Sequence, residues 1–221
     1  MIKARKSEKK QRKNILVAFD RDGTLIYDDG YFGRKDNWKN EIKFYKGGAK
    51  AIKALNVFAD VVVASNQIGV ALGFYKSERV EEINKYLDEI LQKQGAKIDN
   101  WYFSPYVEQN WAKKNGLDLN NPWVLNSFPK TRKPQIGMIK LAANYFGTPI
   151  SFYKENFVIG DSLDDLNMAL NANGIGIFFE NKKNNHLIKK VKSLEFVNKG
   201  RIFRVSKLIS VIKIIKIHSK N

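Results

Sequence analysis

Two kinds of hydrophobic pattern alternate along this chain. Continuous apolar runs, typical of strands covered on both faces of a sheet, lie at 15–19, 57–65, 155–161 and 174–179. Apolar side chains recur at helical spacing between these runs, over 49–56, 77–95, 134–147 and 162–173. This alternation predicts an α/β fold of the Rossmann-like, three-layer kind, in which helices cover both faces of a mostly parallel sheet.

Two residues mark expected helix starts, and two segments are harder to interpret. Ser77 is expected to cap the N-terminus of the second helix, and Pro134 is expected in the first turn of the third. The pattern leaves residues 96–131 irregular. It does not decide between helix and strand for residues 202–217, although this segment is apolar enough to pack on the sheet.

Length and charge suggest one domain with basic ends. The chain has 221 residues, 43% of them hydrophobic, which suffices for one sizeable core. The net charge of +17 is confined to the ends: residues 1–14 carry +6, residues 182–221 carry +11, and residues 15–181 are neutral overall. The sequence therefore predicts a core domain at 15–181, preceded by a basic tail and followed by a basic extension.

The basic ends allow two interpretations. They can be solvated segments, or they can bind polyanions such as RNA or a membrane surface. They carry few of the aromatic side chains that stack on bases, which favours the first interpretation. Residues 1–14 lack the apolar stretch of a secretory signal, and no segment has the roughly 20 apolar residues of a membrane span. The absence of cysteine excludes disulfides and is typical of a reducing compartment, so we expect a cytoplasmic protein.

Polar side chains gather where the predicted strands end. They are Asp20 and Asp22 after the first strand, Ser65, Asn66 and Gln67 at the end of the second, Asp161, Asp164 and Asp165 after the third, and Arg132 and Lys133 just before a helix. Each alone could shape a turn or cap a helix. Because the carboxyl ends of parallel strands meet at one edge, we expect them to lie together. Clustered carboxylates repel one another, and Mg²⁺, which prefers oxygen ligands, would relieve that repulsion.

Four of these segments carry a family resemblance. In order, they are FDRDGTL, SNQ, RKPQIGM and GDSLDD, and they span residues 19–165. The set resembles the four motifs of haloacid dehalogenase superfamily phosphatases. It is most similar to subclass IIIA, which includes the heptose-1,7-bisphosphate and histidinol-phosphate phosphatases and the 3′-phosphatase domain of polynucleotide kinase.

The resemblance implies a role for each acidic residue. Asp20 would be the nucleophile that forms an aspartyl-phosphate, and Asp22 would act as general acid and then as base. Asp20, the backbone carbonyl of Asp22 and Asp161 would hold Mg²⁺. Asp164 and Asp165 would support this metal site.

The resemblance also implies which residues contact the substrate. Lys133 would neutralise both the phosphate and the nucleophile, and Arg132 would contact the rest of the substrate. The remaining implied phosphate-binding residues follow the first two strands: Gly23, Thr24, Ser65, Asn66 and Gln67.

The chain departs from the family pattern at two places. Small-molecule phosphatases of this subclass often carry a Cys/His zinc loop before the RKP motif, whereas residues 102–131 contain neither residue, so we expect no zinc. That stretch is instead rich in aromatics, which either pack a long loop onto the core or form a substrate platform. Ile68 and Leu72 stand where the heptose branch usually has Ser and Arg.

The sequence thus predicts a magnesium-dependent phosphomonoester hydrolase without a large cap domain, because the segments after the first two motifs are short. The expected substrate is a small phosphorylated metabolite such as a heptose phosphate. Two alternatives stay open: a 3′-phosphatase for nucleic-acid ends, to which the basic tails could bind, and a non-catalytic nucleic-acid-binding protein on the same fold. The sequence does not indicate the oligomeric state.

Overall fold

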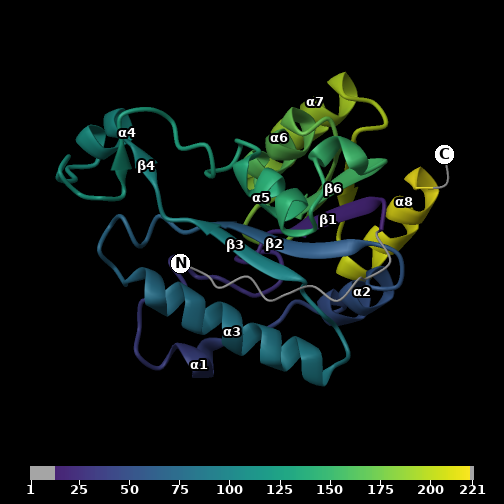
Figure 1. The fold of residues 1–221 in the computed structure, drawn as a ribbon, viewed down its shortest axis with the longest axis horizontal. Helices are drawn as coiled ribbons and strands as arrows, with labels where there is room; N and C mark the ends of the chain where they lie inside the picture. The colour runs from purple at the N-terminus through teal and green to yellow at the C-terminus, as the bar shows by residue number, and fades with distance from the viewer. Residues whose placement is uncertain (1–12, 220–221) are drawn as a thin grey trace.

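A six-stranded parallel sheet forms the centre of the computed structural model, which describes residues 13–219 (Figure 1). The strand order is β3-β2-β1-β6-β7-β8. The strands are β1 (Ile15–Phe19), β2 (Asp60–Asn66), β3 (Asn100–Ser104), β6 (Glu155–Gly160), β7 (Ile175–Phe179) and β8 (Ile202–Val205). The predicted α/β fold with a mostly parallel sheet is confirmed.

Helices cover both faces of this sheet (Figure 1). On one face, Val17 and Phe19 pack in a core with residues of α2 (Gly48–Leu55), α3 (Ser77–Lys93) and α8 (Val211–His218). On the other face, Leu16 and Ala18 pack with residues of α5 (Gly137–Tyr145) and α6 (Leu163–Asn171). Because alternate residues of β1 enter different cores, the strand is apolar throughout, as its sequence predicted.

The C-terminal residues add a strand and two helices. α7 (Ile188–Val197) packs through Val191 against α6, and β8 pairs with β7. Residues 202–217, which the pattern left undecided, contain both kinds of structure: β8 and then α8, which buries Val211 and Ile215. The prediction that this segment packs on the sheet is confirmed. The basic N-terminal tail lies almost entirely outside the described residues, and the proposed domain boundaries stay a prediction.

Three local predictions were wrong. Residues 96–131 are not irregular: they contain β3, the short parallel pair β4 (Val107–Glu108) and β5 (Val124–Leu125), and α4 (Gln109–Lys114). Ser77 does not cap α3, because Lys76 occupies the cap position and the Ser77 hydroxyl donates to Glu78 instead. Pro134 is not in the first turn of α5, because that helix begins at Gly137 and Pro134 lies three residues earlier, in a turn.

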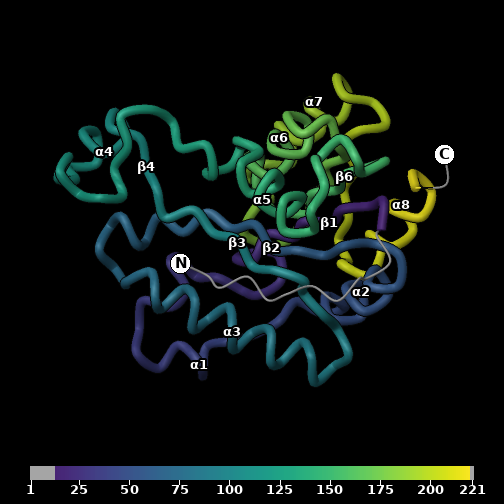
Figure 2. Tube along the Cα trace, in the orientation of Figure 1, coloured from purple at the N-terminus to yellow at the C-terminus, as the bar shows by residue number. Residues whose placement is uncertain are grey.

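The segment with β4, α4 and β5 projects from the main body, while α1 (Trp38–Glu41) lies beside α3 (Figure 2). The projecting segment has its own small core, in which Val107 and Ala112 pack against Ala71. It is too small to be a separate cap domain. No helix in residues 13–219 is long and apolar enough to cross a membrane.

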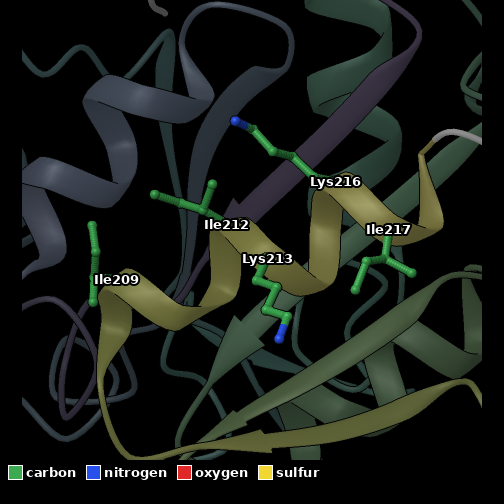
Figure 3. Close-up of a pocket in the computed structure, with 5 residues that line it drawn as sticks. All are labelled: Ile209, Ile212, Lys213, Lys216 and Ile217. Atoms are coloured by element: carbon green, nitrogen blue, oxygen red, sulfur yellow. The ribbon is translucent and has the colours of Figure 1, made fainter.

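A shallow cavity of about 500 Å³ lies along the C-terminal helix (Figure 3). Among residues 13–219, its lining consists of isoleucines and lysines: Ile209, Ile212, Lys213, Lys216 and Ile217. It shares no residue with the polar cluster that is predicted at the strand ends.

Candidate active site

The polar cluster lies at the carboxyl edge of the sheet, as predicted. Asp20 follows β1, Ser65 and Asn66 end β2, and Asp161 follows β6. These strands are adjacent in the sheet, so their ends surround a cavity of about 340 Å³. Eight predicted site residues line it: Asp20, Asp22, Ser65, Asn66, Gln67, Lys133, Asp161 and Asp164.

Lys133 lies at the centre of the buried charges. Its ammonium is 2.7 Å from Asp20 Oδ1 and 2.6 Å from Asp165 Oδ1, and its side chain is only 3% exposed. Burial alone would lower the pKa of Lys133, but the carboxylates of Asp165 and Asp20 outweigh that effect and raise it. The ammonium therefore stays charged and compensates one of its two acids.

Three carboxylates remain close enough to share a cation. Asp20, Asp161 and Asp165 each offer an oxygen, and these atoms lie within 4.8 Å of one another. Burial raises the pKa of Asp20 well above its usual range, against the effect of Lys133, and the nearby acids add to the rise. Burial, followed by repulsion from Asp165, also raises the pKa of Asp161 to about 6. Lys133 alone therefore leaves this cluster short of positive charge.

Asp22 is held by two donors. Arg21 donates from Nε to Oδ1 at 2.9 Å and from Nη2 to Oδ2 at 2.8 Å, and Gln67 Nε2 donates to Oδ2 at 2.5 Å. Arg21 is fully buried and also donates to Asn84 Oδ1 of α3 at 3.0 Å. The sequence did not single out Arg21, because an arginine between two aspartates is typical of a solvated turn.

The side chains at the end of β2 are already engaged with their neighbours. Ser65 Oγ accepts a hydrogen bond of 2.8 Å from Gln67 Nε2. Asn66 bonds the backbone of Lys133 in both directions, accepting from its N–H at 2.9 Å and donating to its carbonyl at 3.3 Å. Asn66 thus fixes the segment that presents Lys133, besides lining the cavity.

Four predicted residues do not line the cavity. Asp165 is fully buried behind it, where it caps α6 and accepts from Lys133. Thr24 is fully buried, and its hydroxyl has no hydrogen-bond partner among the described residues. Arg132 is half-buried and donates to the Tyr106 carbonyl at 3.3 Å. The substrate roles of Thr24 and Arg132 stay predictions.

Gly23, the fourth of these residues, makes room for Asp161. It has φ +78°, and a Cβ at this position would collide with the Asp161 carboxylate. We predict that Gly23→Ala lowers the free energy of unfolding by about 2–4 kcal/mol, because backbone strain and the collision add. Gly116→Ala is the matched control: it has φ +69° but open space around it, so it should lose only about 1 kcal/mol. Equal losses in urea unfolding would contradict this account.

Two asparagines that the sequence analysis missed support Asp161. Asn181 Nδ2 donates to Asp161 Oδ2 at 3.1 Å and to the Gly23 carbonyl at 3.0 Å. Asn184 Nδ2 donates to the Asp161 carbonyl at 3.1 Å. Asn181 comes two residues after β7, so the strand-end rule used for the acids could have found it.

The aromatic residues before the RKP motif mainly pack. Trp111 and Trp123 lie against the small core around Ala112, and the Tyr106 and Trp123 rings are 5.5 Å apart. Phe128 is 39% exposed. None of the described aromatics of this segment lines the 340 Å³ cavity, which favours the packing interpretation over a substrate platform.

Comparison with known proteins agrees with the motifs. A family model described as polynucleotide kinase 3 phosphatase matches residues 15–174. A D-glycero-beta-D-manno-heptose-1,7-bisphosphate 7-phosphatase from Rhodopseudomonas palustris is 30% identical over 78% of this chain and 87% of its own length. The enzyme of the same name from Escherichia coli K12 is 27% identical over 73% of this chain and 76% of its own length.

Solved structures share the fold. A crystal structure of the D,D-heptose 1,7-bisphosphate phosphatase from B. bronchiseptica, complexed with magnesium and phosphate, matches with a TM-score of 0.68 at 21% identity, covering 93% of this chain and 99% of that one. The corresponding enzyme from Burkholderia thailandensis matches with a TM-score of 0.56 at 20% identity, covering 94% and 99%. From the family match and the 30% identical relative, this chain belongs to the polynucleotide kinase 3 phosphatase family and is a phosphatase of the haloacid dehalogenase superfamily.

Proposed function

We propose that this chain is a magnesium-dependent phosphomonoester hydrolase that acts through an aspartyl-phosphate on Asp20, with a small sugar phosphate such as a heptose phosphate as its substrate. The observation that carries the proposal is the position of Asp20. Its carboxylate lines the cavity at the end of β1, 2.7 Å from a buried ammonium and beside two further acids. The ammonium orients this carboxylate, and the cavity gives a substrate access to it, as a nucleophile requires.

The donor set fits Mg²⁺. The acids Asp20 and Asp161 offer carboxylate oxygens on the cavity side, whereas Asp165 is bound by Lys133 and by the cap of α6 and supports them from behind. Burial and repulsion between the acids raise the pKa values of Asp20 and Asp161, and a bound cation would offset both effects. Mg²⁺ would be held by Asp20, Asp161 and the Asp22 carbonyl, and when bound it would neutralise phosphate charge.

The reaction then has two halves. In the first, an Asp20 oxygen forms a bond to phosphorus while the ester bond breaks, and the Asp22 carboxyl gives its proton to the leaving oxygen. In the second, Asp22 takes a proton from the water that attacks phosphorus, and the bond to Asp20 breaks. Lys133 holds Asp20 in place throughout, through the 2.7 Å contact.

The relatives support the choice of sugar phosphate. Both quoted relatives are named as heptose-1,7-bisphosphate 7-phosphatases, and this chain covers 87% and 76% of their lengths. The open cavity admits a small ester, and the loop at 28–31 lines it through Asp28, Gly30 and Tyr31. The description of the matching family favours a second candidate, a nucleic-acid 3′-phosphate.

The test is a comparison of substrates. Initial rates with Mg²⁺ on heptose 1,7-bisphosphate, histidinol phosphate and a 3′-phosphorylated oligonucleotide should rank the heptose ester first, with little dependence on salt. A preference for the oligonucleotide that falls steeply with salt would overturn the sugar-phosphate proposal in favour of the second candidate.

Removal of the cation should make stability depend on pH. Asp161 has a pKa of about 6 in the folded chain against an ordinary 3.8, so folding favours its protonated form. In EDTA, the free energy of unfolding should therefore fall as pH rises through this window, by at most about 3 kcal/mol from this group. Saturating Mg²⁺ should remove the fall, because the ion binds the ionised acids. Urea unfolding curves with the same pH dependence in EDTA and in Mg²⁺ would count against the metal site.

A further inference from the structure

Asp22 can transfer a proton in the proposed reaction only if its carboxyl group points at the ester oxygen. Arg21 donates one hydrogen bond to each oxygen of that group. Arg21 has no freedom of its own, because it is fully buried and bound to Asn84. Gln67 is the second donor residue: its Nε2 donates at 2.5 Å to Oδ2, the oxygen that Arg21 Nη2 also binds.

The orientation of the Gln67 amide decides whether this second contact forms. Its Nε2 donates both to Asp22 Oδ2 and to Ser65 Oγ, at 2.5 and 2.8 Å. A flipped amide would place Oε1 against the Asp22 carboxylate, where two acceptors repel. The group that opposes the flip is Tyr75, whose hydroxyl donates to Gln67 Oε1 at 3.1 Å.

Tyr75 is suited to holding the Gln67 amide in this orientation. Burial raises its pKa above the ordinary value, so the phenol keeps its proton. The residue lines the cavity, and Gly69 makes room for its hydroxyl: a Cβ on Gly69 would collide with the end of the Tyr75 ring. Two features of one short segment, a glycine and a tyrosine six residues later, thus place a single donor against Gln67.

We infer that Tyr75 is a positioning residue for proton transfer by Asp22, acting through the amide of Gln67. The inference rests on the proposed function and adds to it a chain of contacts from Tyr75 through Gln67 to the acid. Removing the hydroxyl frees the amide to turn, and the Asp22 carboxyl group then loses its second donor. The value of kcat/KM should therefore fall only for esters whose leaving oxygen needs a proton from Asp22.

Two aryl esters of similar shape separate this role from a structural one. The phenolate that leaves phenyl phosphate is more basic than the one that leaves p-nitrophenyl phosphate, so it depends more on a proton donor. For Tyr75→Phe, kcat/KM on phenyl phosphate should fall about tenfold, and kcat/KM on p-nitrophenyl phosphate should change less than about twofold. Gly69→Ala, which displaces the Tyr75 ring, should shift the same ratio in the same direction.

Tyr153→Phe is the matched control. Its hydroxyl donates to Asp60 Oδ2, also at 3.1 Å, but Tyr153 is buried in the core and does not line the cavity. This variant should keep both rates at the temperature of the assay. If Tyr75→Phe leaves both esters unchanged or slows both equally, the inference is overturned while the phosphatase function stands. If the parent protein hydrolyses neither these esters nor heptose 1,7-bisphosphate, the proposed function fails and the inference with it.

Discussion

Asp20→Asn should lower kcat/KM for any phosphate ester by at least about a thousandfold while the fold stays intact. An amide has nearly the shape of a carboxylate but is a very poor nucleophile, so the bond to phosphorus does not form. The side chain is 8% exposed and is surrounded by Lys133, Asp161 and Asp165. Removal of one negative charge from this cluster should also raise the midpoint of thermal unfolding in EDTA, because less charge is buried without a partner.

The control for this variant is Glu89→Gln, which makes the same chemical change at an exposed position on α3. Circular dichroism, thermal unfolding and steady-state rates should be measured for both variants. Glu89→Gln should match the parent in rate and stability. Substantial activity in Asp20→Asn, with the protein folded, would remove Asp20 from the role of nucleophile.

Lys133→Met should damage both stability and turnover. It removes the ammonium that lies 2.7 Å from Asp20 and 2.6 Å from Asp165 and leaves both acids buried without compensation. Breaking a buried ion pair by removal of one partner costs about 3–5 kcal/mol. Turnover should fall by at least about a hundredfold, because both the nucleophile and the phosphate lose their cation.

The loss of stability in Lys133→Met should grow as pH rises. Without Lys133, the pKa of Asp20 moves further above its ordinary value, because burial is no longer opposed by the ammonium, so protonation of Asp20 relieves the cluster. The free energy of unfolding of Lys133→Met in EDTA should therefore be nearest to that of the parent at low pH and should fall below it as pH rises. Lys130→Met, an exposed neighbour on the same segment, should behave as the parent at every pH. If Lys133→Met keeps the parental rates, Lys133 has no role in turnover.

The sequence could predict those parts of the fold that depend on local patterns. Strand β1 is buried on both faces, so its apolar run was sufficient to identify it. The acids and amides at the strand ends were found because topology alone brings them together at one edge. Edge strand β3, with the sequence NWYFS, was missed because most of its side chains are half-buried. Its apolar residues therefore follow neither the helical period nor the alternation of a strand.

The contacts that position the site could not be read from the chain in the same way. Arg21 looks like a solvated charge until Asn84, which lies 63 residues further along the chain, is seen to receive its guanidinium. Gln67 was predicted to bind phosphate, but whether its amide also faces Asp22 depends on Tyr75 and on the room that Gly69 leaves. Such contacts depend on side-chain packing between distant segments, and no sequence period encodes packing of that kind.

The account depends most directly on a covalent intermediate at Asp20, and rapid-quench mass spectrometry can detect it. The parent protein is mixed with Mg²⁺ and an excess of phosphate ester, quenched in acid within the first turnover and digested, and the peptide that contains residues 15–28 is examined. The account predicts one added phosphoryl group on this peptide, located at Asp20, and none in Asp20→Asn. Complete turnover without phosphate on the protein at any quench time, or phosphate on a different residue, would contradict it.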